Sequence, residues 1–134
     1  MVCNTALNSF RKWHIGNNIR DILLSDSGVT AQVGQHIYPI IAAEGTDGDF
    51  IVYSRQEYSK SSVKQGVYED NCVVAVVAIS DSYDRAIDLA DKIDLALTGT
   101  HNINEDVSIN IVLQDSTETF EDFKYIETLL YRII

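Results

Sequence analysis

Three aspartates at helical spacing are the residues of this sequence most able to do chemistry. Asp84, Asp88 and Asp91 recur at steps of four and three residues, so a helix would place their carboxylates on one face. Such a face could hold calcium or magnesium, or supply a general acid and a general base. Arg85 and Lys92 interrupt the acidic pattern, and the three aspartates lie opposite the apolar stripe. We therefore interpret this face as a solvated helix surface.

No other catalytic, metal-binding or cofactor-binding pattern is found. His14, His36 and His101 lie in no local motif with serine or cysteine, and no two of them have metal-ligand spacing. The loop Gly45–Gly48 lacks the lysine and the following helix that cradle a phosphate. The sequence therefore predicts a protein that is not an enzyme and carries no cofactor.

Cysteine use and hydropathy indicate a protein made in a reducing compartment. Cys3 and Cys72 are far apart and belong to no Cys-x-x-Cys pair, so both are expected to be free thiols. Residues 1–10 lack the pattern of a secretory signal, and no apolar run approaches the roughly 20 residues of a membrane span. We expect a soluble chain, located in the cytoplasm where it is made.

The charge argues against direct binding to nucleic acid. The 134 residues carry a formal net charge of -10 and no cluster of lysine and arginine that could neutralise phosphates. The length fits one domain, residues 1–134.

Apolar spacing predicts two helices. The first runs over residues 4–24 and is ended by residues 25–28, which lead into a short connector through Gly34. Residues 80–82 cap the second, and Thr98 and Gly99 stop it. Its expected core stripe is Tyr83, Ala86, Ile87, Ala90, Ile93 and Leu97.

Five strands are expected. They cover residues 36–41, with Pro39 at an edge or a strand end, 50–58, 71–79, 107–113 and 124–134. The run 71–79 is apolar on both faces, which is typical of a central strand covered above and below, and residues 115–118 are predicted to form a turn. The fold class is therefore α+β, with two helices on a mainly antiparallel mixed sheet in the order α-β-β-β-α-β-β.

The segment SKSSVKQG, residues 59–66, is predicted to be a flexible loop and is the one locally basic patch of the chain. We hypothesise that it is a protein interface that becomes ordered on contact with a partner. The candidate interface residues are Tyr58, Lys60, Ser61, Ser62, Lys64, Gln65 and Tyr68.

Three stretches, in order and spanning nearly the whole chain, resemble the tail-completion (tail terminator) family of long-tailed bacteriophages, whose members are siphovirus-type minor tail proteins. DILLSDSGVTAQVGQHIYPI, residues 21–40, is similar to the opening of that family. FIVYS, residues 50–54, resembles its first long strand, with Asp49 in a place where the family often carries a proline. VVAISDSYDRAIDLADKIDLALTG, residues 76–99, is similar to its central strand and the helix that follows.

The resemblance implies a structural protein of the virion tail, assembled in the cytoplasm of the bacterial host. Six copies would form a ring on the head-proximal end of the tail tube, stop tube polymerisation and present a surface for the head connector. The implied partners are other copies of the chain, the tail tube protein and the head connector or head-closure protein, with no membrane. The genome would pass through the bore, and some of the surplus carboxylates could face and repel it.

Other functions remain open at this point. A head-closure or neck protein would belong to the same particle at a different place. A small metal-dependent hydrolase would use the Asp84, Asp88 and Asp91 face. A small ligand-binding α+β domain would need a closed apolar pocket.

Overall fold

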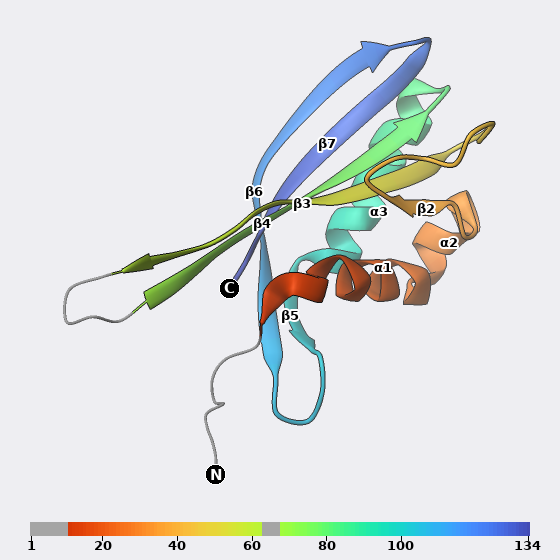
Figure 1. The fold of residues 1–134 in the computed structure, drawn as a ribbon. Coiled ribbons are helices and arrows are strands. Elements are labelled where there is room, and N and C mark those ends of the chain that lie inside the picture. The colour runs from red at the N-terminus through yellow and green to blue at the C-terminus, as the bar shows by residue number, and fades with distance from the viewer. Residues whose placement is uncertain (1–10, 63–67) are drawn as a thin grey trace.

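The computed structural model describes residues 11–62 and 68–134, where one sheet carries its helices on one side (Figure 1). The predicted α+β class is confirmed. The helical elements are the 3-10 turn η1 (Lys12–His14), α1 (Ile15–Ser25), α2 (Ser27–Val33) and α3 (Tyr83–Leu97). The strands are β2 (Ile37–Pro39), β3 (Phe50–Ser62), β4 (Tyr68–Ser80), β5 (Gly99–Asn102), β6 (Ser108–Glu121) and β7 (Lys124–Ile133).

The strand order across the sheet is β2-β3-β4-β7-β6-β5. Only β2 and β3 pair in parallel, and the other neighbours are antiparallel. β4 lies inside the sheet, as its two apolar faces predict, and Pro39 ends the edge strand β2, as also predicted. Both faces of β4 are buried around Val73–Val76, as predicted, although the helices lie on one side of the sheet only (Figure 1).

The core lies between the helices and that side of the sheet. Helices α1 and α3 each bury one stripe of branched side chains, as helical spacing requires. The buried residues are Ile15, Ile19 and Leu23 from α1, Leu89, Ile93 and Leu97 from α3, and Ile51, Val74, Val76 and Tyr131 from the strands. Of the stripe expected on α3, Tyr83 and Ile87 are exposed instead, and Leu89 takes a core place. Each fully buried residue of this size contributes about 1.5–3 kcal/mol to folding.

Residues 25–28 end one helix and begin another, so the predicted connector is wrong. The Asp26 carboxylate accepts the backbone N–H of Val29 at 3.0 Å and caps α2. Val29 and Val33, one helical turn apart, are buried in the core. The cap and the paired valines are the sequence signal for this helix, although it has only seven residues.

The predicted order also lacks β5, and the predicted turn at residues 115–118 lies inside β6. The true turn of this hairpin is Asp122–Phe123, whose φ angles are 50° and 64°. Two positive φ angles suit the tight two-residue turns that join antiparallel strands. Sequence periodicity misses the outer half of β6 because residues 112–121 are exposed on both faces, so no alternation marks the strand.

Irregularities in β3 and β6 occur on the same transverse row of the sheet. The register shifts between Arg55 and Glu57 in β3, and between Leu113 and Asp115 in β6. The ladders place Arg55 and Leu113 in one row through β4 and β7. Because a bulge bends a strand and increases its twist, two bulges in one row curl the sheet along one line.

Asp49 holds three elements together just before β3. Its carboxylate accepts hydrogen bonds from Gln32 of α2 and Ser80 of β4, each at 2.7 Å, and pairs with Arg85 of α3 at 3.2 Å. Burial alone would raise the pKa of this carboxyl, but the bonds from Gln32, Ser80 and Arg85 outweigh it and lower the pKa. Asp49 is therefore a structural anchor of this fold.

Truncating two leucines of α3 tests which face supports the fold. We expect Leu89→Ala to lower the free energy of unfolding by about 2–5 kcal/mol, because it opens a cavity in the core. Leu95→Ala, on the same helix with a side chain that is 76% exposed, should change it by less than about 0.5 kcal/mol. Urea denaturation followed by circular dichroism measures both, and similar losses for the two variants would contradict this packing.

Candidate protein interface

The predicted flexible loop is wrong for its first four residues. Ser59–Ser62 continue β3 and pair with Tyr68–Asn71 of β4. Polar side chains made this segment resemble a loop, but at a projecting hairpin the strand is maintained by backbone pairing and needs no apolar face. Ser61, Ser62 and Tyr68 are therefore strand residues, and Lys64 and Gln65 lie outside the described residues.

Tyr58 belongs to a cluster of aromatic rings around one arginine. Its ring meets that of Trp13 edge to face, with centroids 5.4 Å apart. The Arg55 guanidinium lies 4.7 Å from the Trp13 centroid and 5.8 Å from that of Tyr58, and it donates to the Trp13 carbonyl at 3.1 Å. These contacts fix the root of the β3–β4 hairpin on the segment that precedes α1.

Lys60 shares one carboxylate with a second lysine that the sequence did not single out. Asp70 pairs with Lys12 at 3.0 Å and with Lys60 at 3.3 Å, and Lys12 is buried whereas Lys60 is exposed. Burial would raise the pKa of Asp70, but the two lysines outweigh it and lower the pKa. Asp70 therefore compensates part of the basic patch predicted here.

The sheet face away from the helices, here called the outer face, is largely apolar. Cross-strand partners share a face, so the ladders assign residues to it from β3, β4, β7 and β6. Its apolar members are Phe50, Val52, Val73, Ala75, Val77, Ile79, Ile126, Leu130 and Val112. Val112 is 46% exposed, whereas the other members are buried or half-buried by neighbouring side chains, and no described helix covers this face (Figure 1). An apolar sheet face without a covering helix is a candidate interaction site.

The tip of the β6–β7 hairpin presents a second apolar feature. Phe123 is 87% exposed and adopts a φ of 64°, a conformation that bulky residues avoid. Behind it, Tyr125 packs between Phe120 and Tyr83, with centroids 4.7 Å and 5.6 Å away. The hairpin is thus held against the start of α3 while its most exposed ring points into solvent.

Two glutamates oppose each other across β6 and β7. Glu118 and Glu127 are direct cross-strand partners, and the Tyr83 hydroxyl donates to both Glu118 oxygens at 3.1 Å. Burial, followed by the hydrogen bond with Glu118 and the repulsion from its charge, raises the pKa of Glu127 from 4.5 to about 7. Glu127 therefore keeps its proton up to about neutral pH, and ionising it beside Glu118 costs stability.

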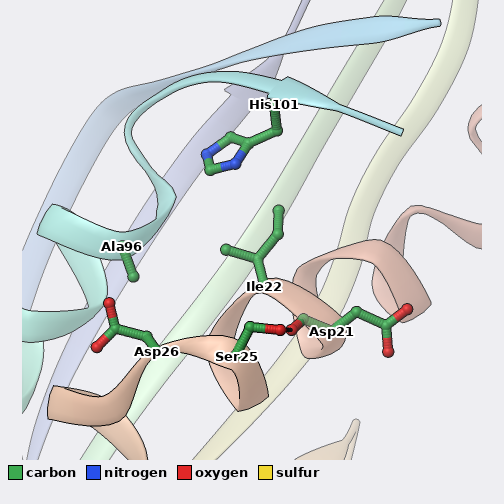
Figure 2. A pocket seen from close by; sticks show the side chains of 6 residues that line it. All are labelled: Asp21, Ile22, Ser25, Asp26, Ala96 and His101. Atoms are coloured by element: carbon green, nitrogen blue, oxygen red, sulfur yellow. Dashed lines mark hydrogen bonds between the residues drawn. The ribbon is translucent and has the colours of Figure 1, made fainter. Parts of the chain in front are cut away.

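A shallow pocket brings a serine, two aspartates and a histidine together (Figure 2). The side chains of His101, Ser25 and Asp26 are already used for local structure. His101 Nε2 donates to the Leu97 carbonyl at 2.7 Å, the Ser25 hydroxyl donates to the Asp21 carbonyl at 2.8 Å, and Asp26 caps α2. No hydrogen bond joins Ser25 to His101, so the arrangement lacks the nucleophile and base contact of a hydrolase.

The aspartate face of α3 is solvated. Asp84, Asp88 and Asp91 are all exposed. Within residues 11–62 and 68–134, no three acidic, histidine or cysteine side chains are grouped closely enough to hold a metal ion. Cys72 is buried, and burial raises the pKa of its thiol. In the same residues no helix is both long and apolar enough to cross a bilayer.

This fold, with helices on one face of a curled six-stranded sheet, occurs in a known virion protein. A chain of the solved structure described as "Virion of native gene transfer agent (GTA) particle" superimposes with a TM-score of 0.70. The alignment covers 86% of this chain and 89% of that chain, at 16% sequence identity. No family model matches the sequence, and the search of curated proteins finds no match. At this identity the similarity demonstrates a shared fold.

Replacing Glu127 with glutamine should make stability less sensitive to pH. The raised pKa means that the contribution of Glu127 to stability is fully present below about pH 4.5 and is lost as the pH rises through about 7. Glu127→Gln removes the second ionisation, so its midpoint in urea should exceed that of the wild type at pH 8, and the gap should close toward pH 4.5.

Glu121→Gln on the exposed end of β6 is the control, because it removes the same charge away from the carboxyl pair. If both variants shift the midpoint equally at pH 8, general charge repulsion would explain the effect and the pairing of Glu118 with Glu127 would not.

Proposed function

We propose that this chain is a structural subunit of a phage-like virion, and that it closes the head-proximal end of the tail tube as a ring. The observation that carries the proposal is the uncovered apolar outer face, on a fold shared with a virion particle protein. The sequence resemblance to tail-completion proteins supplies the position in the tail. In this role the ring stops tube polymerisation and offers its opposite side to the head connector.

The surface properties suit a subunit that works by docking. A ring needs two unlike patches on each copy, because a head-to-tail contact must close by rotation. The β3–β4 and β6–β7 hairpins extend to opposite ends of the sheet and differ in composition (Figure 1). The described pockets contain no nucleophile and base pair, which favours assembly over catalysis.

The β3–β4 hairpin is proposed as one contact surface with a neighbouring copy or with the tube. The residues involved are Tyr58, Lys60, Ser61, Ser62, Lys64, Gln65 and Tyr68. Two of them belong to clusters that hold their position, Tyr58 with Trp13 and Lys60 with Asp70. A contact surface held in place before binding loses less conformational freedom on association.

Mixing the purified chain with purified tail tubes that lack heads tests this function. We expect electron microscopy to show one ring at one end of each tube, and capped tubes to stop growing when more tube protein is added. A decoration along the whole tube, or none at all, would contradict the proposal.

Phe123→Gly separates docking from folding. Glycine adopts a positive φ without strain, so the variant should fold with unchanged or higher thermal stability. If the exposed ring at the hairpin tip contacts the tube or the connector, the variant should cap tubes at least tenfold less well in titration. Full capping by Phe123→Gly would exclude the hairpin tip from the interface.

A further inference from the structure

The sheet has two long free edges that point away from each other. β5 pairs only with residues 108–111 of β6, and β2 pairs only with residues 51–53 of β3. Within the described residues, no strand pairs with the outer sides of Val112–Glu121 of β6 or Ser54–Ser62 of β3. These two segments are called the β6 edge and the β3 edge. A free edge of this length is a template for another strand.

We propose that the β6 edge of one copy pairs with the β3 edge of the next copy, so that the ring is closed by a sheet continuous across the subunit boundaries. This inference rests on the proposed ring and names the contact that forms it. It assigns a second copy of this chain as the occupant of both edges.

Strand direction allows the pairing. β3 and β7 run one way and β4 and β6 the other, since each neighbouring pair is antiparallel. A rotation about an axis near the strand direction keeps these directions, so β6 of one copy meets β3 of the next as an antiparallel pair. The alternation of strand directions would continue across the subunit boundary, and two unlike edges would form a head-to-tail contact.

Charge favours the same pairing. The β6 edge carries Asp115, Glu118 and Glu121 and no basic residue. The β3 edge carries Arg55 and Lys60 with a single acid, Glu57. In a chain of net charge -10, two β6 edges would repel each other, whereas the β6 edge and the β3 edge attract.

The offset between the edges fits a closed sheet. The ladders place Ser116 level with Tyr53, so the middle of the β6 edge lies about five residues, or about 17 Å, from the middle of the β3 edge along the strands. Four strand spacings of about 4.8 Å, about 19 Å in all, separate one β3 from the next. A strand tilt of about 40° therefore brings the two edges level, and closed sheets tilt by about 35–45°.

Ser116 offers a direct test, because it lies on the β6 edge and its backbone N–H donates to the neighbouring Asp115 carboxylate, at 2.8 Å, which a pairing strand would replace. Ser116→Pro removes this donor, and proline is tolerated on edge strands. Ser116→Ala keeps the donor and is the matched control. We expect mass photometry, and electron microscopy with tail tubes, to show that Ser116→Ala forms rings like the wild type and that Ser116→Pro forms none. Circular dichroism should show that Ser116→Pro is folded.

Cross-linking tests the contact without relying on a proline. Ser59 of β3 and Asp115 and Thr117 of β6 lie on the outer face, so continuous sheets would bring Ser59 of one copy near the other two in the next. Mild oxidation of Ser59→Cys combined with Asp115→Cys or with Thr117→Cys should yield a ladder of covalent oligomers with at least one pair. The three single cysteine variants should not.

The outcomes separate the two proposals. Rings formed by Ser116→Pro would overturn the edge pairing and leave the tail-capping role intact. The same holds if both cysteine pairs form wild-type-like rings but give no cross-linked oligomers. A wild-type chain that forms no ring even on tail tubes would overturn the role, and the edge contact with it.

Discussion

The burial of one sheet face against the helices is the constraint on which the other features depend. Helix α1 buries Ile19 and its neighbours against β3, α3 buries Ile93 and its neighbours against β4 and β7, and this layer contains the described core cluster. Because the helices occupy a single side, no described helix covers the outer face, and no described strand pairs with the two long edges. The surfaces available for docking are thus a consequence of how the core is built.

Two carboxylates near the boundary of the core hold helices and strands in place. Asp49 joins α2, α3 and β4, and Asp70 joins two lysines at the hairpin root. In both cases hydrogen bonds and opposite charges overcome the cost of partial burial, which lowers the pKa of each carboxyl. Glu127 is different, because its nearest partner is another acid and its pKa rises.

Curvature links this architecture to an assembly role. Two bulges in one row bend the sheet, and its free edges are offset along the strands by an amount that a tilted closed sheet would absorb. The fold shared with a gene transfer agent particle protein is compatible with such a subunit. In the proposed ring, the exposed Phe123 and the apolar outer face would have a common explanation as surfaces that assembly covers.

Local pattern alone determined the α+β class, the inner position of β4, the α3 helix and the edge position of Pro39, because each depends on periodicity or on one residue's chemistry. It also identified the exposed aspartate face of α3. Only the tertiary structure decided that Ser59–Ser62 are strand, that Lys12 meets Asp70, and that one sheet face is uncovered. These features depend on pairing between distant segments, and polar hairpin strands exposed on both faces leave no periodic signal in the sequence.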